Sequence, residues 1–442
     1  MVRVRAENGP SGADGVSSAP PAARKVFSLF LIKPSHYDDD GYVIQWAKSS
    51  IPSNTLAAMY GLALDCAERR VLGDAVEIRI TAWDETNTRI RPERIIRAIQ
   101  AGDGLVCLVG VQTNQFPRAV DLARPLRAAG IPVCIGGFHV SGCLAMLPAI
   151  PPEMRDAMDL GIALFAGEAE GRFEHLLQAA HAGRLEPLYN HMNDLPGIEG
   201  APIPFLPADV VRGTSGMRTS FDAGRGCPFL CSFCTIINVQ GRQSRTRSPD
   251  DIEHIVRTNL AQGIHNFFIT DDNLARNQNW ETIFDLLIRL REEEGQRIYI
   301  VAQVDTMCHK IKGFIEKAAR AGINRIFIGL ENINPDSLKE ARKGQNQITE
   351  YRALLQAWHR HGVLTYAAYI LGFPHDTPAS IERDIRIIQR ELPIDIIEFF
   401  ILTPLPGSAD HQRLYLDGVE MKPDLNQYDL FHVTTHHPRM SD

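Results

Sequence analysis

The chain has 442 residues and a formal net charge of −7 at pH 7, and 44% of its residues are hydrophobic. This length suggests about two to three domains, and the hydrophobic content is typical of globular domains with buried cores. The mild acidity lacks the basic footprint of a nucleic-acid-binding protein. The sequence has no run of about 18 apolar residues that would predict a membrane span. Its eight cysteines are too few for a disulfide scaffold in so long a chain.

The N-terminal half begins with residues 1–24, which are rich in Gly, Ala, Ser and Pro and are expected to form a disordered tail because they have little to bury. This tail also lacks the apolar region of a signal peptide. From residue 25 to 190, helical stretches such as Pro92–Ala101 and Ala119–Ala129 alternate with short apolar segments. The alternation predicts a Rossmann-like parallel sheet with helices on both faces. The predicted strands are Val26–Ile32, Val76–Ala82, Leu105–Val111, Ile131–Ile135 and Leu160–Phe165.

A proline-rich segment, residues 191–218, is interpreted as a linker between two domains. From 219 to 410, six strand-like segments again alternate with helical ones, which predicts a partial (β/α)6 TIM-like barrel. Ser248, Pro249 and Asp251 form an N-cap, a first-turn proline and a capping-box acid at the first barrel helix. The predicted barrel strands are Thr219–Gly224, Asn266–Thr270, Tyr299–Val304, Arg325–Leu330, Thr365–Leu371 and Ile394–Leu402, and the predicted helices are 251–262, 280–293, 310–321, 336–342, 349–361 and 378–391.

Three cysteines follow the first predicted barrel strand: Cys227, Cys231 and Cys234, spaced as C-x3-C-x2-C. Thiolates this close do not form ordinary long-loop disulfides, but they can converge on one iron–sulfur cluster. Three ligands for a four-iron cluster leave one iron open, and an open metal position is typical of a site that binds substrate. Structural zinc, which would need a second pair of ligands, and a chance spacing are the alternatives. The other cysteines are interpreted as buried apolar residues or stand alone: Cys66, Cys107, Cys134, Cys143 and Cys308.

The cysteine loop, with Phe233 directly before its third cysteine, resembles that of the radical S-adenosylmethionine (SAM) superfamily. The resemblance implies that the open iron chelates SAM. An electron from the reduced cluster, delivered by a donor such as flavodoxin or ferredoxin, would cleave SAM to methionine and a 5′-deoxyadenosyl radical. The SAM-binding residues implied by the resemblance are Phe233, Asp271, Asp272, Gln303, Glu331, Gly372 and Pro374. Arg245 and Arg247 either neutralise charge near the cluster loop or form a solvated basic stretch.

The N-terminal half resembles the cobalamin-binding domain of B12-dependent radical SAM proteins through its Gly-Gly-x-His and Gly-Glu-x-Glu patterns, at 136–139 and 167–170. In open parallel sheets, ligands bind beyond the carboxyl ends of the strands. The implied cobalamin contacts are Gln112, Thr113, Gly136, Gly137, His139, Gly167 and Glu168. One departure is that no histidine has an aspartate two residues before it, so the Asp-x-His-x-x-Gly motif whose histidine ligates cobalt is absent. We therefore expect cobalamin without a protein nitrogen on cobalt. The alternatives are a domain kept for packing or substrate binding, and a hydrogen-bonded structural role for His139.

The resemblance implies a cobalamin-dependent methyltransferase, in which cobalt carries a methyl group from one SAM and the radical from a second SAM activates the substrate. Radical rearrangement, cyclisation or sulfur insertion without methyl transfer is an alternative, and so is a non-catalytic cobalamin or cluster sensor. An air-sensitive cluster and free thiols predict a cytoplasmic protein. The sequence does not indicate the substrate, a small molecule or a peptide. The C-terminal extension, residues 411–442, holds four histidines whose spacing does not predict a metal site: His411, His432, His436 and His437.

Overall fold

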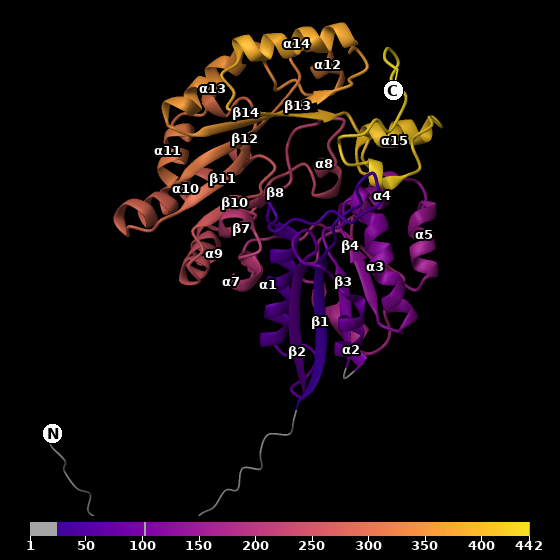
Figure 1. The fold of residues 1–442 in the computed structure, drawn as a ribbon. Coiled ribbons are helices and arrows are strands. Elements are labelled where there is room, and N and C mark those ends of the chain that lie inside the picture. The colour runs from indigo at the N-terminus through magenta and orange to yellow at the C-terminus, as the bar shows by residue number, and fades with distance from the viewer. Residues whose placement is uncertain (1–23, 101–102, 442) are drawn as a thin grey trace, which may run out of the picture.

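The computed structural model describes residues 24–100 and 103–441, so almost all of the tail predicted over residues 1–24 lies outside the described residues. The described chain forms two six-stranded parallel sheets and a short two-stranded sheet. Figure 1 shows the first large sheet (indigo to magenta) below the second (magenta to yellow), with helices around both. The predicted fold class is confirmed: a Rossmann-like sheet is followed by a six-stranded, TIM-like sheet.

The first sheet has the strand order β2-β1-β3-β4-β5-β6. Helices α1 and α6 supply the core on one face, and α2, α3, α4 and α5 supply the core on the other. The strand order reverses between β1 and β3, which is where ligands bind in sheets of this type. The strands are β1 (Lys25–Lys33), β2 (Val76–Asp84), β3 (Asp103–Leu108), β4 (Val133–Gly136), β5 (Ala163–Ala166) and β6 (Leu188–Asn190), and the helices are α1 (Asn54–Glu68), α2 (Pro92–Gln100), α3 (Phe116–Ala128), α4 (Phe138–Met146), α5 (Pro152–Asp159) and α6 (Phe173–His181).

Strand β1 illustrates why these segments become central strands. Its sequence, KVFSLFLIK, is almost continuously apolar, and the six residues from Phe27 to Ile32 are all buried. A strand covered by helices on both faces needs apolar side chains in both directions. Two other elements of this half, α1 and β6, carry no clear sequence pattern. Gly61 of α1 lies against the segment that follows the first sheet, and a Cβ on Gly61 would collide with the Ile203 carbonyl group.

The second sheet has the order β14-β13-β12-β11-β10-β7, with β7 and β14 at its edges, so the barrel is partial within the described residues. Its elements follow the predicted ranges, except that the predicted helix 280–293 ends as a π-helix over Arg289–Glu293. The strands are β7 (Arg218–Phe221), β10 (Asn266–Ile269), β11 (Tyr299–Val304), β12 (Ile323–Glu331), β13 (Leu364–Leu371) and β14 (Ile396–Ile401), and the helices are α9 (Pro249–Ala261), α10 (Trp280–Ile288), α11 (Phe314–Ala321), α12 (Pro335–Glu340), α13 (Tyr351–Arg360) and α14 (Pro378–Glu391).

The start of α9 confirms the predicted capping box. Ser248 Oγ accepts a hydrogen bond from Asp251 N over 3.1 Å, and the Asp251 carboxylate accepts one from Ser248 N over 2.9 Å. Pro249 occupies the first turn, where no backbone N–H is needed. This local device fixes the point at which the chain leaves the cysteine loop and enters the helix layer.

The C-terminal extension returns to the first sheet through α15 (Ala409–Leu416). Figure 1 shows α15 (yellow) beside α4 (magenta). Gln412 Nε2 donates to the Met146 carbonyl at the end of α4 over 2.5 Å. A Cβ on Gly142 would lie 2.9 Å from Gly407 Cα, so a glycine in α4 allows the two backbones to approach closely. The extension therefore joins the two halves of the chain.

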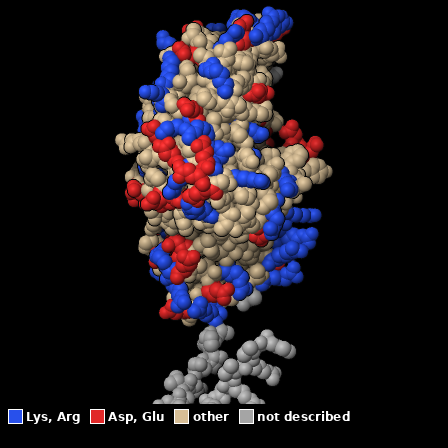
Figure 2. Space-filling view, turned by 90° about the vertical axis from the view of Figure 1, so that its left-hand side faces the viewer, with Lys and Arg blue, Asp and Glu red and all other residues tan. Residues whose placement is uncertain are grey.

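One outer face of the barrel, over α9, α10 and α11, is covered by charges of both signs, as Figure 2 shows. These charges are paired: Arg257 with Glu253 and Glu294, Arg289 with Glu253, Lys317 with Glu281 and Asp285, and Arg320 with Glu292. Mixed, paired charge is typical of a solvated helix surface and creates no single-sign field. Within residues 24–100 and 103–441, no helix is both long and apolar enough to cross a membrane.

Candidate active site

The three cysteines lie in the loop that follows β8 (Gly224–Arg225), a short strand placed directly after β7. The loop begins at Gly226, whose φ of 93° is left-handed. A Cβ at this position would lie 2.5 Å from the Gln243 carbonyl oxygen. Glycine avoids both the backbone strain and the collision, so Gly226 sets the direction in which the cysteines leave the strand.

Backbone hydrogen bonds anchor this loop to two separate elements. Cys227 N donates to the Gly241 carbonyl over 3.2 Å, and Ser232 N donates to the Ala341 carbonyl over 3.0 Å. Gly241 lies in the turn beyond α8 (Ile236–Val239), whereas Ala341 follows α12 in the barrel. The loop therefore has a defined position before any metal binds.

The chemistry of the loop fits an iron–sulfur cluster. Burial raises the pKa of the Cys227 thiol and raises that of Cys234 to about 12. Cys231 is 7% exposed, and Gln345 Nε2 lies 3.5 Å from its sulfur. Burial and hydrogen bonds to sulfur are features by which proteins tune such clusters. Because metal binding requires thiolates, loading this site would release the thiol protons.

Beside the cysteines lies Lys343, which no sequence pattern singles out. Its ammonium group pairs with Glu331 and lies 5.6 Å from the centre of the Phe233 ring. Burial alone would lower the pKa of Lys343, but the charges of Glu331 and of Cys231 outweigh burial and raise it. Lys343 is thus a fixed positive charge at the cysteine loop. In the sequence it stands in an Arg-Lys-Gly turn that is typical of a solvated surface, so nothing local indicates its burial.

Glu331 ends β12 in an unusual backbone conformation. Its φ is 62°, a left-handed value that is uncommon outside glycine and that clusters at functional sites. The register between β12 and β13 shifts between Gly329 and Glu331, and such irregularities re-aim a side chain. Here the carboxylate is directed at Lys343. The role of Glu331 in SAM binding stays a prediction, and Lys343 is its structural partner.

The two aspartates that end β10 have different surroundings. Asp271 accepts hydrogen bonds from Ala223 N over 2.7 Å and from Gly224 N over 2.8 Å, so it fixes the chain that leads into the cysteine loop. Within residues 24–100 and 103–441, Asp272 has no comparable set of donors, and burial, followed by the charge of Asp271, raises its pKa to about 7. Burial also raises the pKa of Asp271 to about 7. Gln303 Nε2 lies 3.5 Å from the Asp271 carbonyl oxygen. These three predicted SAM residues therefore lie together at neighbouring strand ends.

The segment after β13 contains the other predicted SAM residues, Gly372 and Pro374. The Asp376 carboxylate accepts from Gly372 N over 2.9 Å and from Phe373 N over 3.0 Å, which shapes the turn. The rings of Phe373 and Phe233 meet edge to face at 6.3 Å, so this turn and the cysteine loop are neighbours. The C-terminal extension also reaches it, because His437 Nε2 lies 2.9 Å from the Phe373 carbonyl oxygen.

A cavity of about 150 Å³ opens at the carboxyl edge of the first sheet. Clefts at this edge are where ligands bind in open parallel sheets. Gly137 has a φ of 149°, and a Cβ there would lie 2.7 Å from the Gly110 carbonyl carbon, so the turn beside the cavity requires glycine. The cavity is lined by the predicted residues Gly136, Gly137, Gly167 and Glu168, and also by Thr55, Ser141, Val239, Gln240 and Arg225, which the sequence does not single out for it.

The other three predicted cobalamin contacts do not line this cavity. Gln112 and Thr113 belong to the short 3-10 turn before α3. His139 is fully buried, its Nδ1 lies 3.4 Å from Thr113 Oγ1, and its ring packs 4.5 Å from that of Phe116. The side chain of His139 is thus packed among α3, α4 and α5, in keeping with the structural alternative for this residue.

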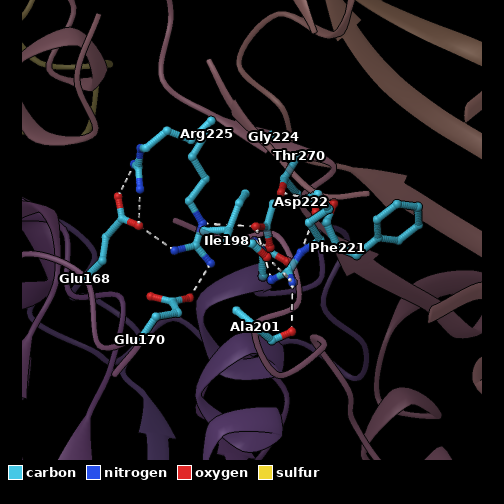
Figure 3. Close-up of polar contacts among 12 residues, drawn as sticks. Glu168, Glu170, Ile198, Ala201, Phe221, Asp222, Gly224, Arg225 and Thr270 are labelled. Carbon is cyan, nitrogen blue, oxygen red and sulfur yellow. Dashed lines mark hydrogen bonds and ion pairs between the residues drawn. The ribbon is translucent and has the colours of Figure 1, made fainter. Parts of the chain in front are cut away.

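A buried ion-pair network joins the cavity to the cysteine loop (Figure 3). Arg225, two residues before Cys227, donates to Glu168 over 2.7 Å, to Glu170 over 2.7 Å and to Asp222 over 3.0 Å. Arg245 also pairs with Glu168. The glutamates of the Gly-Glu-x-Glu pattern therefore hold the arginine that leads into the loop, and the two halves of the site are fixed relative to each other.

Arg247 also belongs to this network, because it lies against Asp222. Its side chain is 0% exposed and lies 3.5 Å from the Asp222 carboxylate. It also donates to the Ile198 carbonyl over 3.2 Å and to that of Ala201 over 3.3 Å. Burial alone would raise the pKa of Asp222, but Arg225 and Arg247 hold it below its usual value. Arg245 and Arg247 thus neutralise buried carboxylates, and the alternative of a solvated basic stretch is wrong.

Comparison with known proteins agrees with this geometry. The family model of the radical SAM superfamily matches residues 223–388, which include all three cysteines. Residues 223–388 therefore form a radical SAM domain. This radical SAM protein is 26% identical over 356 residues to bacteriochlorophyllide d C-8(2)-methyltransferase of Chlorobaculum tepidum, covering 75% of this chain and 73% of that protein. It is 25% identical to hopanoid C-2 methylase of Rhodopseudomonas palustris, covering 76% of this chain and 62% of that protein.

The fold is also that of solved radical SAM proteins. The radical SAM methyltransferase TsrM from Kitasatospora setae superposes with a TM-score of 0.64 at 16% identity, over 89% of this chain and 77% of that one. The cobalamin-dependent radical SAM enzyme OxsB superposes with a TM-score of 0.62 at 14% identity, over 94% of this chain and 65% of that one. At such identities the likeness concerns the fold, and it extends over most of the chain.

Proposed function

We propose that this radical SAM enzyme is a cobalamin-dependent methyltransferase. The observation that carries the proposal is the shared cavity: Arg225, Val239 and Gln240, from the segments flanking the cysteines, line it together with the glycine turns of the first sheet. A cofactor held there would face the cysteine loop across the Arg225–Glu168–Glu170 network. The methyltransferase names of relatives that match about three quarters of the chain support the same reaction class.

The cysteine loop supplies the first part of this function. Cys227, Cys231 and Cys234 would hold a four-iron cluster, which when bound supplies the one-electron cleavage of SAM to methionine and a 5′-deoxyadenosyl radical. Lys343 offers a buried positive charge for the carboxylate of SAM, and the Glu331 carboxylate offers an acceptor for its ammonium group. In the SAM complex, these two residues would exchange their mutual ion pair for pairs with the ligand.

The cavity of the first sheet supplies the second part. Gly136, Gly137 and Gly167 bring backbone close to a ligand without side-chain obstruction, and Ser141 Oγ, which accepts from Gly167 N over 3.0 Å, braces one of these turns. Cobalamin bound there would supply methyl transfer. The buried position of His139 supports a cobalt without a protein nitrogen ligand, because its ring is occupied by contacts outside the cavity.

Cobalamin content of anaerobically purified protein, produced with the vitamin supplied, tests the proposal. We expect iron, sulfide and cobalamin in the wild type, with no nitrogen splitting in the electron paramagnetic resonance of its Co(II) form. Ala169→Trp, which would fill the cavity, should remove cobalamin and leave iron in place, whereas Ala182→Trp, at an exposed helix end, should retain both. SAM cleavage without any bound cobalamin would refute methyl transfer and favour a radical rearrangement or cyclisation.

A further inference from the structure

A second group of metal-ligating side chains lies away from the cysteine loop, between α4 and α5. His139, Cys143 and Glu153 each direct one donor atom into it, and these atoms all lie within 4.8 Å of one another. His139 and Cys143 are four residues apart on α4 and share one helix face, and Glu153 lies in the first turn of α5. We propose that these three residues bind a divalent transition metal, with Zn²⁺ as the ion that matches their chemistry.

The imidazole of His139 is poised as a ligand. It is 0% exposed, and its Nε2 has no hydrogen-bond partner among the described residues, although the Glu153 carboxylate lies 3.5 Å away. Its other nitrogen, Nδ1, lies 3.4 Å from Thr113 Oγ1. Histidines that bind metals usually hydrogen-bond through the second ring nitrogen in this way, which orients the ring. A cation between His139 and Glu153 would satisfy a buried nitrogen that the protein leaves unpaired.

His411, from the C-terminal extension, is the candidate for a fourth ligand. It is 6% exposed, and its Nδ1 is also buried without a partner in the described part of the chain. It is not among the three residues whose donor atoms lie within 4.8 Å of one another, so binding to the same ion would require its side chain to move.

The donor set selects the metal. Thiolate and imidazole favour Zn²⁺ over Mg²⁺ or Ca²⁺, which take oxygen ligands. Tetrahedral zinc, with bonds of about 2.0–2.3 Å, places its donor atoms about 3.3–3.8 Å apart. The 3.5 Å between His139 and Glu153 already fits this range, and no other pair of donors needs to approach by more than about 1.5 Å. Binding forms a zinc–sulfur bond as the Cys143 S–H bond breaks, and the proton leaves to solvent. No electron is transferred, so no redox partner is needed.

A metal at this place would fasten α15 to the first sheet. The two segments already touch, because Gly142 of α4 lies against Gly407 and Gln412 donates to Met146. The site shares no residue with the cysteine loop or with the lining of the cavity of the first sheet. The proposal therefore stands or falls independently of the proposed reaction.

Zinc content of the full-length chain tests the site. The measurement uses protein in which Cys227, Cys231 and Cys234 are changed to Ala, so that the cluster thiols take up no zinc. We expect about one zinc per chain after dialysis against a weak chelator. Adding Cys143→Ala should weaken zinc binding by at least about 10- to 100-fold. Adding Cys66→Ala, which alters another buried cysteine of the same half, should leave it unchanged.

Cobalt substitution provides a readout that does not depend on the stability of a variant. Co²⁺ added to the same cluster-free protein should give the intense thiolate-to-cobalt absorption of a tetrahedral site, since Cys143 is the sulfur ligand. Zinc and cobalt bound equally well by the Cys143→Ala protein would overturn the proposal. So would a cluster-free protein that takes up neither zinc nor thiolate-ligated cobalt.

Discussion

Arg225 is the residue whose loss should most affect both halves of the site, and Arg225→Met is the sharpest test of the network. The side chain is 9% exposed and holds three carboxylates. After the substitution, Glu168 keeps its ion pair with Arg245, and Asp222 keeps its ion pair with Arg247. Glu170, which is 6% exposed, pairs only with Arg225 among the described residues. One buried carboxylate is therefore left unpaired.

Leaving one member of a buried ion pair without its partner costs about 3–5 kcal/mol, and we expect Arg225→Met to lower the free energy of unfolding by about this amount. Arg257→Met is the matched control, because Arg257 also holds two glutamates but is 44% exposed. Exposed ion pairs contribute little, so the control should lose far less stability.

Urea unfolding of anaerobic protein measures both effects, and hydrogen exchange over 163–171 and 222–227 shows whether the opening is local. The double variant Arg225→Met/Glu170→Met should recover most of the loss, because it removes the unpaired charge together with its partner. The reasoning is wrong if Arg225→Met costs no more than Arg257→Met, or if the double variant is less stable than Arg225→Met alone.

Three further predictions concern the cysteine loop. Glu331→Ala should raise the SAM dissociation constant about 10- to 100-fold, which corresponds to the loss of one charged hydrogen bond, and should leave the iron content unchanged. Anaerobic calorimetry measures the affinity, and equal affinities of the variant and the wild type would contradict this prediction. Gly226→Ala should lower the free energy of unfolding by at least about 1–3 kcal/mol and should lower the iron content, because it adds a collision to a left-handed φ. Gly263→Ala is the control: its φ is 78° but the space around it is open, so this variant should keep its iron. The pKa of Asp272 is raised from 3.8 to about 7 in the folded protein. Between these values the folded protein holds a proton on Asp272 that the unfolded protein releases. The stability of cluster-free protein should therefore fall as pH rises from about 4 to 7. In Asp272→Asn the melting temperature should depend less on pH, and an unchanged pH profile would argue against this titration.

Features that depend on a few adjacent residues could be predicted from the sequence. The capping box of Ser248 and Asp251 lies within one helical turn, and the structure forms it as expected. Most strands are recognisable because a parallel strand buried on both faces must be continuously apolar, as β1 is. Helix α1 lacks such a signal, and its Gly61 lies against a distant segment, where a Cβ would collide with the Ile203 carbonyl group.

The spacing of Cys227, Cys231 and Cys234 predicted an iron–sulfur site by itself, because three ligands for one cluster can come from a single loop. Only the tertiary structure decided what surrounds that loop. Arg225 meets Glu168 across 57 residues of chain, and Lys343, from beyond α12, lies 5.6 Å from the ring of Phe233 in the cysteine loop. Such pairs follow from the packing of one sheet edge against another. No periodicity or local motif couples residues so far apart, so the burial of these charges, and with it their role, appears only when the chain is folded.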